Sequence, residues 1–195
     1  MVLKQNDFTE QAQEALSMSQ QLVVQMRHNQ WDAEHLLSGL LQIQNSLSAQ
    51  ILGALGVDTS DLLQEIQAKL EESPKIGGSN SQPQIYPTPR VQKAIEVAKE
   101  EATRLKDELI GADHLLVALS KESSGDLADI FQSHNITEER VYQALLEVRG
   151  SARVTDPRAE SKYQALAKYS VDLTELAREG QLDPVVGRDL EIRRV

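Results

Sequence analysis

Histidines and acidic residues are the side chains here that could bind a metal ion or act in catalysis, since the sequence has four histidines and no cysteine. His35 and His114 each follow an acidic residue and precede two leucines. Neither has a second histidine four positions away, so the spacing of a helical zinc site is missing. We therefore expect each imidazole to be packed near the start of a helix with one backbone hydrogen bond, and no metal site.

Motifs for hydrolysis and for nucleotide binding are also missing. The sequence has no Gly-x-Ser-x-Gly nucleophile elbow and no linked nucleophile–base pair. It has no Gly-x-x-x-x-Gly-Lys-Ser/Thr loop, which would supply the backbone cradle and the lysine that hold phosphates. We predict that these residues catalyse no reaction, hydrolyse no ATP and use no cofactor of their own.

Glu34 and Asp113 are candidates for binding. They directly precede His35 and His114, at about the second position of two expected helices. A carboxylate at that position interacts favourably with the helix dipole, by about 0.3–1 kcal/mol. Alternatively, the two carboxylates could receive basic groups of a bound polypeptide. We favour the dipole interpretation, because dipole complementation is common.

The elements that carry these residues form a tandem repeat with an offset of 79 residues. Ala33–Leu40 recurs as Ala112–Leu119, and the apolar positions around the two blocks also agree. An internal repeat of this kind indicates a duplicated structural unit. One four-helix unit would leave apolar surface exposed, so we expect the two units to pack together. We predict an all-α domain of two four-helix units related by a pseudo-twofold axis.

Cap residues and apolar spacing predict the helix limits. In the first repeat, helices are expected from the N-cap Thr9 to about Met26, from Ala33 to about Ile43, from about Ser48 to Leu55, and from the N-cap Asp58 to about Leu70. Gly56, and Asn135 in the second repeat, should end a helix in the left-handed conformation. The leucines expected to be buried in the central helices are Leu36, Leu37, Leu40, Leu115, Leu116 and Leu119. The expected domains are 1–150 for the double repeat (repeats about 9–70 and 88–149, loop 71–87), 151–162 for a linker, and 163–195 for a further segment.

Composition limits the partners. Acids outnumber bases, 30 to 20, for a net charge of −10. Nucleic acid and anionic membranes reward clustered lysine and arginine, so we expect neither as a partner. The absence of cysteine fits a reducing compartment, and no signal peptide or stretch long enough to span a bilayer is evident. We expect a cytoplasmic protein that is monomeric over these residues.

Some apolar residues lie outside the pattern that the two repeats share. Leu22 and Val24 have Glu101 and Thr103 as repeat mates, and Leu109 is matched by Gln30. A groove at the joint before the second central helix, with acidic neighbours, would suit unfolded segments that expose apolar and basic side chains. The candidate substrate-binding residues are Thr9, Leu22, Val24, Glu34, Asp107, Leu109, Ile110 and Asp113, with Leu109, Asp107 and Asp113 expected on one concave surface.

The duplicated Ala-Glu/Asp-His-Leu-Leu blocks resemble the N-terminal domain of the Clp ATPases. Asp172–Ala177, Gly180–Asp189 and Glu191–Arg194 resemble the entrance to their first AAA+ module. Arg188–Asp189 and the loop that starts Pro74-Lys75-Ile76-Gly77-Gly78 resemble the ClpB type more than the protease-linked ClpC type. The resemblance covers nearly the whole chain. It implies that residues 163–195 open an AAA+ module and that the sequence is a piece of a longer protein.

The resemblance also implies a function, that of a stress-response chaperone. A ClpB-type protein is a homohexameric disaggregase with a coiled-coil insertion, which works with a DnaK-type chaperone system and threads unfolded or aggregated proteins through its ring. Its full length would bind ATP and magnesium, with Val185 and Val186 beside the adenine. In such proteins the N-terminal domain engages substrate. Two alternatives remain open: an adaptor-docking domain of a protease-associated Clp ATPase, or a structural spacer that never touches substrate.

Overall fold

A computed structural model describes residues 4–76, 85–122, 124–150 and 152–160, and also Arg178 and Gly180. The chain divides into two compact units, Met1–Tyr163 and Gln164–Val195, and the fold described below is that of the first. Nearly all of 163–195, with Val185 and Val186, lies outside the described residues. The prediction of an AAA+ entrance there stays a prediction.

Eight α-helices form the described part of the chain, as the repeat predicts. They are α1 (Glu10–Gln25), α2 (Ala33–Gln42), α3 (Leu47–Ala54), α4 (Thr59–Glu72), α5 (Pro89–Arg104), α6 (Ala112–Ser120), α7 (Gly125–Ser133) and α8 (Glu138–Arg149), preceded by a 3₁₀ turn, η1 (Gln5–Asp7). Helix α1 corresponds to α5 at both ends with the offset of 79 residues, and α4 and α8 begin at equivalent residues. The expected all-α duplicated fold is therefore confirmed.

Cap residues set these helix limits. The hydroxyl of Thr9 accepts a hydrogen bond from the amide of Ala12 (3.2 Å), and Thr88 does the same for Val91 (3.3 Å). Each bond satisfies an amide of the first helical turn, which has no partner within the helix. Gly56 (φ 78°) and Asn135 (φ 53°) adopt the predicted left-handed conformation after α3 and α7.

The two repeats are joined by exchanged backbone pairing. Strand β1 (Gln30–Trp31) of the first repeat pairs in parallel with β2 (Tyr86–Pro87), which leads into the second. The equivalent bridge joins Phe8, ahead of the first repeat, to Ile110 in the second. Two matching bonds follow, Thr88 N–H to Trp31 O (2.9 Å) and Thr9 N–H to Ile110 O (3.0 Å). Because each contact recurs with the repeats interchanged, the arrangement is pseudo-twofold.

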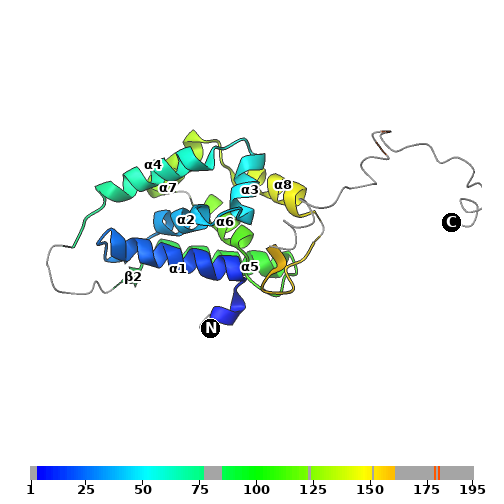
Figure 1. Ribbon diagram of the computed structural model, residues 1–195, viewed down its shortest axis with the longest axis horizontal. Coiled ribbons are helices and arrows are strands. Elements are labelled where there is room, and N and C mark those ends of the chain that lie inside the picture. Colours follow the sequence, from blue (N-terminus) through cyan, green and yellow to red (C-terminus); the bar gives the residue numbers. More distant parts are fainter. Residues whose placement is uncertain are drawn as a thin grey trace, which may run out of the picture. The chain divides into compact units, whose positions relative to one another are not determined.

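Helices α2 and α6 occupy the centre of this unit, with α1 and α5 on one side and the remaining helices on the other (Figure 1). All nine residues from Ala33 to Leu41 are buried, and so are the eight from Ala112 to Leu119. The predicted core leucines, Leu36, Leu37, Leu40, Leu115, Leu116 and Leu119, are all buried. The central helices thus hold the polar residues of their first turns, Glu34, His35, Asp113 and His114, inside a packed core.

Candidate functional site

The histidines at equivalent positions of the two repeats, His35 and His114, are helix-capping groups. Nδ1 of His35 accepts a hydrogen bond from Asp32 N–H (3.2 Å), and Nδ1 of His114 accepts one from Gly111 N–H (2.7 Å). Burial, and then the neighbouring His28, lower the pKa of His35 to about 4, so its imidazole is neutral at neutral pH. Among the described residues, no group of three or more His, Asp or Glu side chains could hold a metal ion. The expected backbone partner is present at both histidines.

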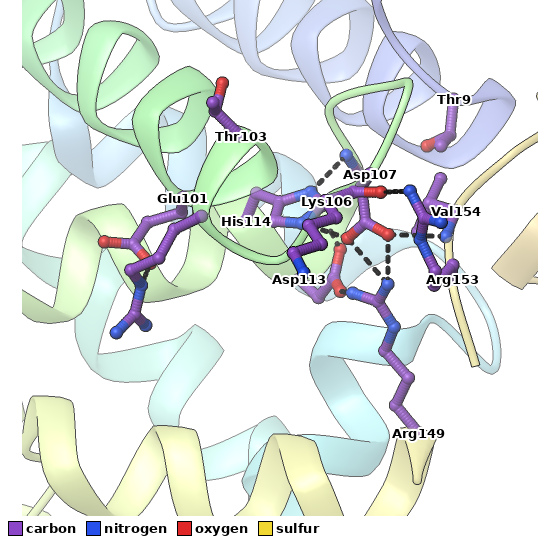
Figure 2. Close-up of polar contacts among 12 residues, drawn as sticks. Thr9, Glu101, Thr103, Lys106, Asp107, Asp113, His114, Arg149, Arg153 and Val154 are labelled. Atoms are coloured by element: carbon purple, nitrogen blue, oxygen red, sulfur yellow. Dashed lines mark hydrogen bonds and ion pairs between the residues drawn. The ribbon is translucent and has the colours of Figure 1, made fainter. Parts of the chain in front are cut away.

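An ion cluster lies beside α6. Arg149 donates from Nη1 to Asp113 Oδ2 (2.9 Å) and from Nη2 to Asp107 Oδ1 and Oδ2 (2.5 and 2.6 Å). Figure 2 shows its guanidinium reaching up from α8 to both carboxylates. The aspartate side chains are 0% exposed and that of Arg149 is 5% exposed. Buried carboxylates of this kind need such a partner, since an unpaired charge out of water is very costly.

His114 extends this cluster. Its Nε2 lies 2.9 Å from Asp107 Oδ2, and its role as acceptor at Nδ1 makes Nε2–H the donor. Burial opposes ionisation of Asp107, but hydrogen bonds from His114, Arg149 and the Val154 amide hold its pKa below the ordinary value. His28 is the repeat mate of Asp107, and it contacts His35 in the same way, with 2.9 Å between Nδ1 and Nε2. The first repeat therefore has two neutral rings where the second has a charged network.

Glu160 caps α6 in place of the N-cap aspartate that the second repeat lacks. In the first repeat, the carboxylate of Asp32 accepts from Ala33 N–H (2.8 Å) and from the Thr88 hydroxyl (2.9 Å). Its repeat mate is Gly111, which has no side chain. In the second repeat, Glu160 Oε1 accepts instead from Ala112 N–H (2.7 Å) and from the Thr9 hydroxyl (2.9 Å).

The space for this carboxylate exists because residue 111 is glycine. A Cβ on Gly111 would come within 2.9 Å of Glu160 Oε1 and 2.3 Å of Asp113 Oδ1. The contribution of Glu160 was not predicted, since this residue lies in the predicted linker. The signal was available, because Gly111 occupies the position of an N-cap aspartate between otherwise matching repeats.

Residues 152–160, which we call the strap, pack on the domain within the segment predicted as a linker. Val154 N–H donates to Asp107 Oδ1 (2.7 Å), Glu108 N–H donates to Val154 O (2.9 Å), and Glu10 N–H donates to Pro157 O (2.8 Å). Val154 and Glu160 are buried. The predicted site residues Thr9, Asp107 and Asp113 are therefore brought together, but around the strap and Arg149.

Glu34 also has partners within the chain. Arg90 binds it with two hydrogen bonds (2.8 and 3.1 Å), and Glu34 Oε1 accepts from Leu127 N–H at the start of α7 (3.2 Å). Glu34 thus joins α2 of the first repeat to α5 and α7 of the second. The carboxylates of Glu34 and Asp113 are both engaged in internal ion pairs.

The predicted concave surface needs a correction. Asp107 and Asp113 have no exposed side-chain area, so they do not share an open groove with Leu109, which is half-buried. The reason is the pairing with Arg149, which holds both carboxylates inward. Ile110 is buried as the backbone partner of Phe8. The remaining apolar candidates separate: Leu22 packs partly on the core, and Val24 is 47% exposed.

A shallow cleft lies between α5 and α6, on the surface of the second repeat. Its volume is about 210 Å³, and it is lined by Lys93, Ala94, Val97, Ala118, Leu119, Lys121 and Glu122. Four of these side chains are apolar, and three are charged. Within the part of the chain that the structure describes, no helix has the length and apolar character to cross a membrane.

The fold defines a class of protein. Residues 7–134 match the family model of the Clp repeat (R) N-terminal domain, and the chain belongs to this family. The Hsp104 N-terminal domain from Candida albicans has the same fold, with a TM-score of 0.69 and 22% identity over 79% of this chain and 99% of that chain. The resemblance to the Clp ATPases is confirmed.

Within the family, the sequence is ClpB-like. It is 38% identical to the chaperone protein ClpB of Bacillus cereus over 191 residues. This aligned stretch covers 97% of this chain and 22% of that protein. It is 44% identical over 161 residues to the chaperone protein ClpB of Mycobacterium bovis, covering 83% of this chain and 19% of that protein. The chain thus spans about a fifth of the length of these relatives.

Proposed function

We propose that this domain engages unfolded or aggregated polypeptides for an ATP-dependent disaggregase, in which a hexameric ring threads them. Its relatives are chaperone proteins, and one observation in this chain supports substrate contact: the apolar cleft between α5 and α6. Unfolded chains expose apolar side chains, which a shallow apolar surface binds without requiring a defined sequence.

The cleft is apolar because of the residues at its base. Ala94 and Val97 come from α5, and Ala118 and Leu119 come from α6. The charged lining residues Lys93, Lys121 and Glu122 carry both signs, and Lys121 and Glu122 are paired within the chain, so they do not restrict the bound segment to one charge. Ordering a flexible chain opposes binding, so we expect weak and reversible capture.

A difference between the repeats explains why α5 and α6 leave this space. The repeat mate of Ala118 is Gly39, and a Cβ on Gly39 would lie 2.4 Å from the carbonyl oxygen of Ala15. Helix α1 therefore approaches α2 more closely than a side chain at position 39 would allow. At the equivalent position, the Cβ of Ala118 rules out so close an approach of α5 to α6.

The remaining features of the proposal belong to the longer protein. They are a cytoplasmic homohexamer, ATP and magnesium bound by its AAA+ module, contact of Val185 and Val186 with the adenine, and cooperation with a DnaK-type chaperone system. Adaptor docking in a protease-associated Clp ATPase is the alternative for the domain itself. A spacer that touches no substrate is the other.

Val97→Ser tests the cleft. Loss of apolar contact should weaken capture of a reduced, alkylated model protein about five-fold, which corresponds to about 1 kcal/mol. The measurement is titration of the 195-residue chain with that unfolded protein, followed by fluorescence anisotropy. The thermal midpoint of each variant is recorded, so that loss of folding is recognised.

Leu146→Ser is the matched control, because Leu146 is 61% exposed on α8 and does not line this cleft. It should leave capture unchanged. Val24→Ser tests the alternative site on α1, and Leu109→Ser tests the joint before α6. If only these two variants weaken capture, the cleft is not the substrate surface. Undiminished capture by all folded variants would place the substrate surface elsewhere on the chain, and no capture by the unaltered chain would favour the spacer or the adaptor-docking function.

A further inference from the structure

Two buried carboxylate oxygens beside the start of α6 have no hydrogen-bond partner among the described residues. They are Oε2 of Glu160 and Oδ1 of Asp113. The two carboxylates are neighbours, since both come within 3 Å of the position that a Cβ on Gly111 would take. Their other oxygens are used, Glu160 Oε1 by Ala112 and Thr9, and Asp113 Oδ2 by Arg149. A buried acceptor without a donor is costly, so two adjacent ones require an explanation.

Four polar side chains of the described residues lie near this pair of carboxylates. Thr9 donates its hydroxyl from the N-terminus of α1, Arg149 faces Asp113 from α8, and Asp107 lies on the far side of Arg149. The fourth is His114, whose Nδ1 is 3.4 Å from Asp113 Oδ1. Nδ1 of His114 accepts the Gly111 amide hydrogen, so it has no proton to give to Asp113 in that state.

We propose that Glu160 and Asp113 share one proton, and that this proton keeps the strap on the repeat domain. A proton on Glu160 Oε2 is donated to Asp113 Oδ1, which satisfies both oxygens with a single hydrogen bond. Two adjacent carboxylates out of water do not both ionise readily, so one of them retains its proton. Glu160 Oε1 then remains free to cap α6 and to accept from Thr9. This inference does not depend on the proposed function of the domain.

Electrostatics agree with this geometry. Burial, and then the charge of Asp113, raise the pKa of Glu160 to about 7. Burial disfavours the charged form of His114, but Asp113 and Asp107 raise its pKa, so His114 is the second titrating group that faces the pair. Between the ordinary 4.5 of glutamate and about 7, docked Glu160 keeps a proton that a released strap would lose. Docking is therefore strongest below pH 4.5, weakens as the pH rises to about 7, and stays weak above it.

The consequence concerns how the domain is held by the chain that follows it. In the sequence, the strap comes shortly before the second compact unit, Gln164–Val195. Loss of the proton near neutral pH frees Glu160 and uncaps α6, which gives the following segment a longer tether. Thr9, Asp107 and Asp113 then act as positioning residues for the strap, by way of Glu160, Val154 and Arg149.

Amide NMR of the 195-residue chain tests the shared proton. The reporters are Ala112 N–H, which Glu160 accepts, and Val154 N–H, which Asp107 accepts. Between about pH 5 and about pH 9, both signals should shift with one midpoint near 7, and the side-chain carboxyl carbon of Glu160 should titrate with the same midpoint. Signals of both amides that do not change over this range would overturn the proposal.

Glu160→Gln imitates the protonated form, because its amide donates where the shared proton lies. Both reporters should then keep their low-pH positions throughout. Glu10→Gln is the matched control: Glu10 is exposed, lies beside the strap and pairs with Arg158 (2.9 Å), so its loss removes the same charge without touching the pair. It should titrate like the unaltered chain. A Glu160→Gln variant that titrates like the unaltered chain would contradict the shared proton.

Asp113→Asn gives an independent result if Glu160→Gln does not fold. An asparagine can accept from Arg149 and donate to Glu160, so the loss of the Asp113 charge should lower the Glu160 midpoint toward its ordinary value. The pH dependence of His114 is followed from its ring carbon signals, which separates its titration from that of the pair. A midpoint that stays near 7 in Asp113→Asn would overturn the proposal.

Discussion

Arg149→Met is expected to lower the free energy of unfolding by about 3–5 kcal/mol. The substitution keeps an unbranched side chain of similar reach but leaves Asp107 and Asp113 without the guanidinium that binds both. Neither carboxylate has exposed area through which water could replace it. Chemical denaturation measures the effect, with the m-value as a check that the compactness of the two states is unchanged.

Arg153→Met is the control, because Arg153 is an exposed arginine of the strap whose guanidinium binds the Lys106 carbonyl. It should cost less than about 1 kcal/mol. Adding Asp107→Asn and Asp113→Asn to Arg149→Met should recover much of the loss, since the stranded charges are then removed. If Arg149→Met costs less than about 1 kcal/mol, the cluster does not hold buried charge as the structure indicates.

The ion pairs of Asp107 and Asp113 with Arg149 also predict how the stability of the domain depends on pH in acid. Asp107 has a folded-state pKa below its ordinary 3.8, so its contribution to stability is present above pH 3.8 and is lost as the pH falls through the folded-state pKa. Glu160 has the opposite sign, because its pKa is raised. Acidification should therefore first strengthen docking of the strap and then, below about pH 3.8, weaken the cluster beneath it.

The repeat could be predicted from the sequence because the residues that begin and end its helices occur twice, at the offset of 79 residues. Thr9 and Thr88 cap equivalent helices, and Gly56 and Asn135 end equivalent ones. Local chemistry of this kind depends on residues only three or four positions apart, so it can be read without knowledge of the tertiary structure. The exchange of backbone pairing between the repeats could not be read in this way, because strands of two residues leave no periodic pattern.

The polar cluster was mispredicted because its contacts are long-range. Arg149 lies 36 residues from Asp113 and 42 from Asp107 along the chain. One comparison would have revealed it, since the repeat mate of Arg149 is Leu70, a buried residue of α4. An arginine at a buried leucine position requires a buried acid. For Glu160, the comparison of Gly111 with Asp32 reveals that a cap is missing, but Glu160 lies beyond the second repeat and has no mate, so the comparison does not identify it as the residue that supplies the cap.

Leu116→Ala is expected to cost about 2–5 kcal/mol, through lost burial and the cavity that remains. Leu116 is 0% exposed in α6, the central helix of the second repeat, which packs on α2, α3, α5 and α8. Its repeat mate Leu37 is equally buried in α2, so Leu37→Ala should cost a similar amount. Leu146→Ala is the control, a leucine 61% exposed on α8, and should change stability by less than about half a kcal/mol.

The form of the unfolding curve decides whether the two repeats are one cooperative unit. Because α2 and α6 contact each other at the centre, a cavity in either repeat should lower a single transition of the whole domain, detected alike by far-ultraviolet circular dichroism and by the fluorescence of Trp31 in the first repeat. If Leu116→Ala instead produced two transitions, with the Trp31 signal unaffected in the first, the repeats would unfold separately. The exchanged pairing of Trp31 with Pro87 and of Phe8 with Ile110 argues against that result, since neither repeat can unfold without exposing the edge of the other.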